Sequence, residues 1–176
     1  EMIFTGNFGK SFRFKTEAMP LIIERLPATI ELALFSILVA LIIAIPAGCL
    51  SAIYQNSILD LFVTIFSTIG RAMPNFWIGI MLIFFFSVVF RILPVSGRLE
   101  ATSIILPAIT LGTSIATTMA RILRSSMIEV IRKEYIVTAK SKGLSKFKII
   151  RSHILRNSLI AVTTVFGLQF AWILGG

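Results

Sequence analysis

The sequence is poor in charged residues and in residues that bind metals or form disulfides. Charged residues make up 14% of its 176 residues, whereas a soluble domain usually carries about 25%. Cys49 is the single cysteine and His153 the single histidine, which excludes an internal disulfide, a thiolate cluster and a multi-histidine metal site. We therefore predict that this chain binds no metal and no cofactor of its own. Hydrophobic residues, in contrast, reach 56%, which is too much apolar surface for one water-soluble core.

Long runs without Asp, Glu, Lys or Arg locate the membrane-spanning segments, because a spanning helix needs about 20 mostly apolar residues. Such runs predict helices near residues 28–54, 61–90, 103–124 and 158–176. Residues 38–45 are apolar at every position, which excludes the alternation of a membrane barrel and leaves helices as the spanning elements. The predicted fold class is an all-α polytopic transmembrane helix bundle, with 1–27 as a lead-in and 28–176 as the membrane domain.

Two prolines interrupt these runs. Pro46 and Pro74 each remove an amide donor, so we expect both to bend their helices, although simple packing kinks would explain them equally well. The run at 61–90 is too long for a straight crossing. It is expected to hold a short interfacial piece at 61–69, a bend, and the crossing from Asn75 to Phe90.

The predicted helix at 103–124 carries two different stripes. A stripe of small residues would let another helix approach closely, and it consists of Gly112, Ala116 and Ala120. The opposite side carries hydroxyl groups at helical spacing, on Thr110, Thr113, Ser114 and Thr117. These hydroxyls either bond back to carbonyls of their own helix or line a wet pathway for a polar solute. The sequence alone does not choose between the two.

Most of the positive charge lies in one segment. Residues 121–156 supply +8 of the formal net charge of +9, with Glu129 and Glu134 as the only acids against ten basic residues. The ten are Arg121, Arg124, Arg132, Lys133, Lys140, Lys142, Lys146, Lys148, Arg151 and Arg156. Because loops rich in Lys and Arg stay on the cytoplasmic side, residues 125–157 are predicted to be cytoplasmic and 1–27 to lie outside. Counting the predicted spans from this loop places the 55–60 turn on the cytoplasmic side, although it has no basic residue. The 91–100 link is then outside.

The basic segment is predicted to form a helix, a glycine corner and a second short helix. Gly143 follows Lys140-Ser141-Lys142, which is typical of a left-handed helix stop, and Ser145 can cap the next helix. The predicted buried faces are Ile128, Ile131, Tyr135 and Ala139 in the first helix, and Phe147, Ile150 and Ile154 in the second. This organisation favours a protein partner. An anionic lipid surface is the alternative, whereas nucleic acid is disfavoured because few aromatic residues interleave the charges.

The same hairpin carries motifs that occur in a known family. They are residues 134–144 (Glu-Tyr-Ile-Val-Thr-Ala-Lys-Ser-Lys-Gly-Leu) and 153–157 (His-Ile-Leu-Arg-Asn), together with shorter pieces at 6–12, 25–29, 74–77, 93–97 and 106–108. In this order, and over nearly the whole chain, they resemble the permease subunits of ABC importers, most closely the branch that imports dipeptides, oligopeptides and nickel.

The general permease motif is Glu-Ala-Ala, three residues, Gly, nine residues, Ile-x-Leu-Pro, and this chain departs from it in part. Ala139, Gly143 and Leu155 match the motif. Val137 stands at its acidic position, Thr138 at its first alanine, and His153 and Arg156 at its isoleucine and proline. The departures are typical of the peptide and nickel branch. A salt bridge from the acidic position to an ATPase is therefore not carried over to this chain.

The resemblance implies a type I ABC importer permease fold in a bacterial or archaeal cytoplasmic membrane, with no catalytic chemistry on this chain. It also implies a homologous second permease subunit, an extracytoplasmic solute-binding protein, and two cytoplasmic ATPase subunits that hold ATP and Mg²⁺. The residues that it assigns to ATPase coupling are Glu134, Tyr135, Ala139, Lys142, Gly143, Leu144, His153 and Leu155. Family members have a spanning helix before the position of Glu1 and at least one after Gly176, so we expect a partial chain.

Three questions stay open at this point. The cargo implied by the resemblance is a peptide, nickel or a metal chelate, or a glutathione-like solute. A non-transporting scaffold or an anchor for anionic lipids is the alternative function. An intramembrane enzyme is disfavoured because the predicted spans contain no Asp and no His. The sequence also has no P-loop glycine motif, so ATP would have to be bound by another chain.

Overall fold

The computed structural model describes residues 8–12, 15–95, 97 and 101–175. The helices are α1 (Ala18–Ile53), α2 (Ile58–Ala72), α3 (Asn75–Ile83), α4 (Ile105–Ile131), α5 (Glu134–Ser141), α6 (Lys146–Ile149) and α7 (Arg156–Gly175). The π-helical segments η2 (Phe84–Val89) and η4 (Ile150–Leu155) continue α3 and α6, and the 3₁₀ turn η3 (Ala101–Ile104) leads into α4. In these residues the only β pairing is an isolated bridge between Lys10 and Glu17. The predicted all-α class is confirmed.

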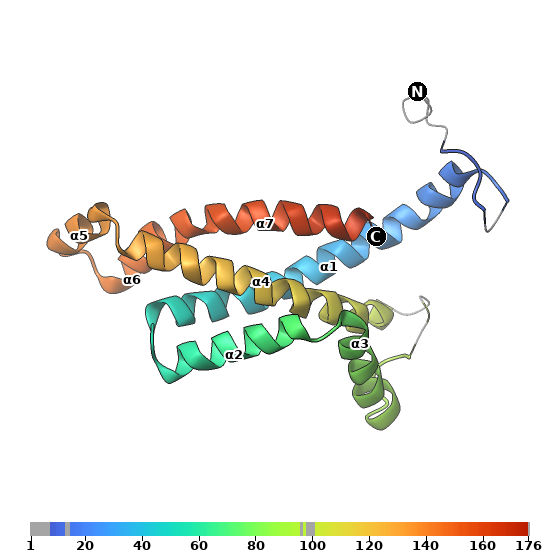
Figure 1. The fold of residues 1–176 in the computed structure, drawn as a ribbon, viewed down its shortest axis with the longest axis horizontal. Coiled ribbons are helices and arrows are strands. Elements are labelled where there is room, and N and C mark those ends of the chain that lie inside the picture. The colour runs from blue at the N-terminus through green and yellow to red at the C-terminus, as the bar shows by residue number, and fades with distance from the viewer. Residues whose placement is uncertain (1–7, 13–14, 96, 98–100, 176) are drawn as a thin grey trace.

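Four helices, α1, α2, α4 and α7, lie side by side along the long axis of the molecule, and α3 turns away from them (Figure 1). α1 and α4 run toward the end that carries α5, while α2 and α7 run back. The α1–α2 turn therefore lies at the same end as the basic hairpin, and the start of α1 lies at the opposite end.

Three continuous helices are long and apolar enough to cross a membrane: Ala18–Ile53, Thr102–Ile131 and Lys146–Gly175. α2 and α3 with η2 make a fourth span only if they are taken together, because the pair is bent by 99°. Pro74 is the N-cap residue of α3 at this bend, where its ring and missing amide prevent a continuous helix. The bend predicted at Pro74 is therefore confirmed, whereas Pro46 lies inside α1, which continues to Ile53.

The helix boundaries differ from the expected ones. α1 begins ten residues before residue 28, because charge-free runs mark only the part of a helix that lipid can cover and Glu24 and Arg25 are exposed in its first turns. Residues 61–69, expected at an interface, belong to α2, which packs along α1 and α4. The expected crossing at 75–90 is the part that turns away. Residues 1–7 of the lead-in and Gly176 at the end of the last expected span lie outside the described residues.

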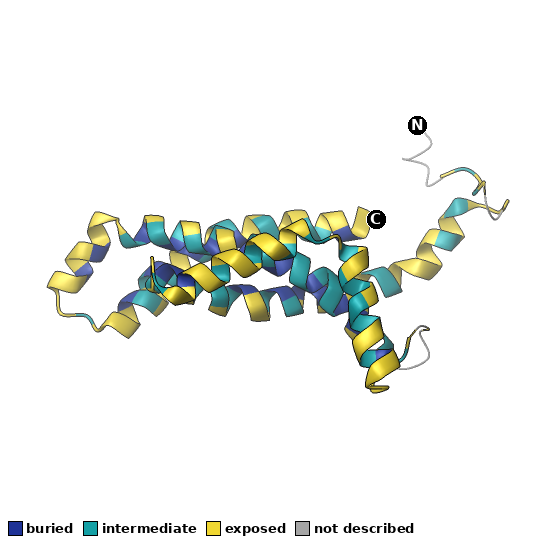
Figure 2. Cartoon of the chain, turned by 60° about the horizontal axis from the view of Figure 1, so that its bottom comes forward, coloured by how far each residue is buried: buried dark blue, intermediate teal, exposed yellow. Residues whose placement is uncertain are grey.

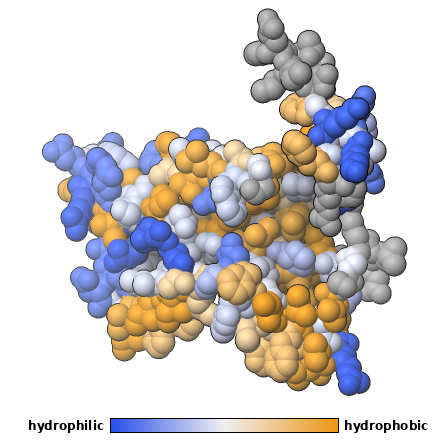
Figure 3. Space-filling view, turned by 45° about the vertical axis from the view of Figure 1, so that its right-hand side comes forward, coloured by the Kyte–Doolittle hydropathy of each residue, from blue (hydrophilic) through white to orange (hydrophobic). Residues whose placement is uncertain are grey.

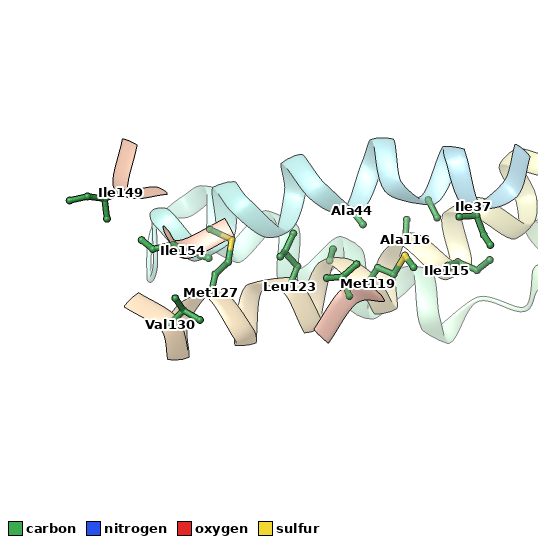
Figure 4. Close-up of a cluster of buried hydrophobic side chains, with 14 of the residues drawn as sticks. Ile37, Ala44, Ile115, Ala116, Met119, Leu123, Met127, Val130, Ile149 and Ile154 are labelled. Atoms are coloured by element: carbon green, nitrogen blue, oxygen red, sulfur yellow. The ribbon is translucent and has the colours of Figure 1, made fainter. Parts of the chain in front are cut away.

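The core of the bundle is the contact between α1 and α4 (Figures 2 and 4). Its α1 side recurs with helical period and consists of Ala33, Ser36, Ile37, Ala40, Ala44, Gly48, Ser51 and Ala52. From α4, the small residues Gly112, Ala116 and Ala120 are buried beside Met119, Leu123 and Met127. A Cβ on Gly112 would lie 2.7 Å from the carbonyl oxygen of Ser36, and one on Gly48 would lie 2.8 Å from that of Ala120. Small residues on both helices thus let the two backbones approach closely.

The outer surface of the bundle is apolar. Large side chains such as Phe62, Phe66, Ile160 and Leu168 are more than half exposed on it. Figure 3 shows hydrophobic residues spread over the lower face, where α2 and α3 lie, and hydrophilic residues gathered at the hairpin end. A surface of this kind is stable in lipid, where it needs no cover of water or protein.

Candidate functional site

The basic hairpin is built into the two long helices that flank it. α4 continues past Arg124 to Ile131 without a break, and α6, η4 and α7 form one helix from Lys146 to Gly175. The prediction of a separate second helix in the hairpin is therefore wrong. Only α5 is a helix of its own. The reason is that Met127, Val130, Ile149 and Ile154 keep a buried stripe on these charged segments, so the helical pattern runs on. A push on the hairpin would consequently reach α4 and α7 directly.

Gly143 ends α5 in a Schellman motif. Its φ is +75°, and its N–H donates to the carbonyl of Lys140 at 2.9 Å. The N–H of Leu144 donates to the carbonyl of Ala139 at 3.3 Å, which completes the pair of bonds typical of this stop. Ser145 then caps α6 by accepting from the N–H of Lys148. A glycine fits here because L side chains rarely adopt this backbone conformation.

The buried anchors of the hairpin agree only in part with those expected: Ala139 and Ile154 are buried as predicted, but Tyr135 and Phe147 are not. Ile136 and Ala139 of α5 are buried, while Tyr135 is 44% exposed, and Phe147 is 70% exposed where Ile149 is buried. The reason lies at Lys133, whose extended backbone separates α4 from α5 and resets the helical phase, so residues 128 and 135 do not share one face. Aromatic and basic side chains of the hairpin therefore point away from the core.

The eight residues assigned to ATPase coupling divide into two groups. Glu134, Tyr135, Lys142 and Gly143 are exposed, while Ala139 is buried and Leu144, His153 and Leu155 are half-buried against the core. The Tyr135 hydroxyl accepts from Nδ2 of Asn157 at 3.3 Å, and the same Nδ2 donates to the carbonyl of His153 at 2.6 Å. This links the start of α5 to the first turn of α7.

Sequence analysis missed an ion pair that joins the base of α4 to the start of α2. Nε and Nη2 of Arg124 donate to the two carboxylate oxygens of Asp60 at 2.7 and 2.8 Å. The same carboxylate accepts from the Ser51 hydroxyl and from the backbone N–H of Asn56, at 3.0 Å for the latter. Asp60 lies in the first turn of α2 rather than in the expected turn, with Ser57 as the N-cap. The sequence did carry a signal for this ion pair. Asp60 is a lone acidic residue beside long apolar runs, and such a residue usually has a charged partner.

The hydroxyl stripe of α4 also divides. The hydroxyls of Thr110, Thr113 and Thr117 donate to carbonyls of their own helix, at 2.8 to 3.1 Å. Ser114 lines a cavity of about 440 Å³ between α3, α4 and α7, whereas Thr110 lines a second cavity and Thr113 and Thr117 a third. The polar residues around the Ser114 cavity are Asn75, Ser114, Thr118 and Gln169, with Trp172 beside them. Among the residues that the structure describes, no three or more His, Cys, Asp or Glu side chains come together to hold a metal.

The chain is similar to a transport family over most of its length. The model of the family described as "Binding-protein-dependent transport system inner membrane component" matches residues 44–176. The di/tripeptide transport system permease protein DppB of Pseudomonas aeruginosa is 37% identical, over 97% of this chain and 59% of its own length. The oligopeptide transport system permease protein AppB of Bacillus subtilis is 39% identical, over 97% of this chain and 58% of its own. The chain thus spans about three fifths of the length of these relatives.

A solved structure supports the fold. A chain of the MetNI methionine ABC transporter in an inward-facing conformation superposes with a TM-score of 0.67 at 20% sequence identity, covering 91% of this chain and 73% of that one. The helix bundle therefore has the fold of that transporter chain. The family description as an inner membrane component, with the apolar helices of this chain, makes it a multi-pass component of the cytoplasmic membrane. Together with the match over residues 44–176, this shows that the chain belongs to the inner membrane components of binding-protein-dependent transport systems.

Proposed function

We propose that the chain is the permease part of an ATP-driven importer of small peptides and carries no catalytic activity itself. The relatives named for di-, tri- and oligopeptide transport support peptides as the cargo. Nickel is not favoured, because no metal-binding cluster is found within the described residues. ATP and Mg²⁺ would be held by two cytoplasmic ATPase subunits. A homologous second permease and an extracytoplasmic binding protein would complete the transporter, with residues 1–27 outside and 125–157 inside.

The observation that carries this proposal is the construction of the hairpin at 125–157. Its inner side is fixed to the bundle by Ile136, Ile149 and Ile154, while Tyr135 and Phe147 are exposed among basic residues. An exposed aromatic side chain in a polar rim is typical of a protein-binding surface. An ATPase that grips this surface would move α4 and α7 together, because the buried residues of the hairpin pack in the same core as both helices and the Tyr135 hydroxyl is bonded to Asn157 of α7. A scaffold or a lipid anchor would need no such mechanical continuity.

The cargo pathway is proposed to pass the polar cavity of α3, α4 and α7. Ser114 lines this cavity, so it is the member of the hydroxyl stripe best placed to meet a solute. Thr110, Thr113 and Thr117 are then structural, because their hydroxyls are already bonded to backbone carbonyls.

The test is dialanine uptake by the complete transporter, with both permeases, the ATPases and the binding protein, in vesicles supplied with ATP. Phe147→Asp places a charge on the exposed surface of the hairpin that the ATPase is proposed to bind. It should abolish uptake and ATPase co-purification without unfolding the bundle. Gly143→Val should also lower uptake, because a β-branched residue strains the corner at φ +75°.

Tyr54→Asp is the matched control. Tyr54 is 50% exposed at the same end of the bundle but lies in the α1–α2 turn, outside the hairpin. Uptake should therefore survive in this variant. Undiminished uptake with Phe147→Asp, or with residues 132–156 deleted, would contradict the proposal.

A further inference from the structure

A cavity of about 370 Å³ between α2 and α4 is lined by three arginines. Arg71 reaches it from α2, and Arg121 and Arg124 reach it from α4. The other lining residues are small or carry hydroxyl groups: Val63, Thr64, Ser67, Thr68, Ala72 and Ala120. None of the described residues that line it is acidic. The cavity is therefore strongly positive and has few bulky side chains.

The three arginines differ in their partners. Arg124 is neutralised by the buried carboxylate of Asp60. Arg71 and Arg121 form no ion pair within the described part of the chain. Two of the arginines that line the cavity, both exposed, thus carry a charge that nothing in this part of the molecule balances.

Helix packing places Arg71 far from the ends of the bundle. A Cβ on the neighbouring Gly70 would lie 2.7 Å from Cγ2 of Thr117, so residue 71 is level with residue 117, close to the middle of α4. That level is about 10 Å along α4 from Arg124, at 1.5 Å per residue. A cation so far from the membrane surface faces a cavity or an anion, because lipid solvates it poorly.

We propose that Arg71 and Arg121 bind the terminal carboxylate of a peptide while it crosses the membrane, an inference that rests on the proposed peptide transport. A guanidinium group matches a carboxylate with two parallel hydrogen bonds. Every di- or tripeptide with a free C-terminus carries this group, whatever its side chains. The small lining residues then leave room for side chains of different size.

Size and depth favour this occupant over other anions. The cavity volume lies in the lower part of the range of small-ligand pockets, roughly 300 to 1,000 Å³, which suits a dipeptide. A lipid phosphate belongs at the headgroup level, whereas Arg71 lies level with the middle of α4.

The experiment measures protection of one site in the assembled transporter, without ATP and without binding protein. Ser67→Cys is introduced in a Cys49→Ala background, and labelling of position 67 by N-ethylmaleimide is followed by mass spectrometry. Millimolar dialanine should slow labelling several-fold, while dialanine amide should not. Arg71→Gln and Arg121→Gln should remove the protection, and Arg71→Lys should keep part of it.

Arg91→Gln is the control for Arg71→Gln and Arg121→Gln, because it removes the same charge at another position. Arg91 lies outside the cavity, so protection should persist in this variant. Equal co-purification of the ATPases with Arg71→Gln and Arg71→Lys shows that both complexes are assembled.

Three results would overturn the inference: no protection by dialanine, equal protection by the acid and the amide, or protection that survives both glutamine variants. Labelling that responds to anionic lipid but not to peptide would assign the arginines to a headgroup instead and would also overturn it. A transporter with Ser67→Cys and Cys49→Ala that imports dialanine but shows no protection contradicts this inference alone. A wild-type transporter that imports no dialanine contradicts the proposed peptide transport and this inference with it.

Discussion

α4 packs against α1 and against α2 in different ways. Toward α1 it presents small residues, and the two backbones come so close that a Cβ on Gly112 would meet a carbonyl oxygen at 2.7 Å. Toward α2 it presents Arg124 in its ion pair with Asp60, and the two helices border a cavity lined by arginine. The close contact leaves no room for a solute, whereas the polar contact provides both room and charge. Facing α1, α4 can thus act as a rigid spine, while its other sides border the arginine-lined cavity toward α2 and the polar cavity toward α3 and α7.

The largest effect should come from breaking the α1–α4 contact. Gly112→Leu would push against Val39 and the carbonyl of Ser36, so we expect it to destabilise the bundle by about 3 kcal/mol or to prevent folding. Thermal unfolding in detergent measures this change. Gly167→Leu in α7 is the control, because a Cβ there meets nothing within 4 Å. Equal melting temperatures for the two variants would disprove close packing at Gly112.

A smaller loss is expected on the polar side of α4. Asp60→Asn removes the anion that balances Arg124, and we expect a loss of about 2 kcal/mol, since the Arg124 side chain is 31% exposed and water compensates in part. The double variant Asp60→Asn with Arg124→Gln should lose less than the two single variants added together. Denaturant titration of the four proteins measures the coupling. If the stability losses of the two single variants simply add up in the double variant, the ion pair contributes nothing to stability.

The hairpin corner should respond locally. Gly143→Ala places a methyl group where space is open but the backbone is left-handed, so the cost should be about 1 kcal/mol and confined to α5. Hydrogen exchange of the amides at 134–144 should become faster. Lys142→Ala, at the neighbouring position with ordinary backbone angles, should leave exchange unchanged. Slower exchange in the Gly143 variant would contradict the strain argument.

The smallest effect is expected within the hydroxyl stripe. Thr113→Val removes a hydroxyl that bonds only to its own helix, so stability should change by less than about 1 kcal/mol and dialanine uptake should stay the same. Gln169→Leu, in the polar cavity of Ser114, should lower uptake. If Thr113→Val abolished uptake instead, the threonine side of α4 would be the pathway.

Local signals in the sequence predicted the parts of the fold that depend on neighbouring residues. Pro74 predicted the bend between α2 and α3, and Gly143 and Ser145 predicted the stop and the cap in the hairpin. The burial of Ile136 in place of Tyr135 was not predictable, because it depends on the phase reset at Lys133. Continuity of the hairpin with α4 and α7 was also missed, since the charged residues set the predicted ends of the membrane helices near 124 and 158, while buried residues between them keep both helices intact.

Composition and charge by themselves determined that the chain is a membrane-embedded helix bundle, because so many apolar residues have no other stable environment than lipid. Tertiary structure alone decided which of its arginines are neutralised. Asp60 and Arg124 are 64 residues apart in sequence and meet only because α2 folds back along α4. The same packing brings Arg71 level with Thr117, where it forms no ion pair with the described residues. Side-chain identity is a property of the sequence, but the partner of a charge is set by which helices pack together.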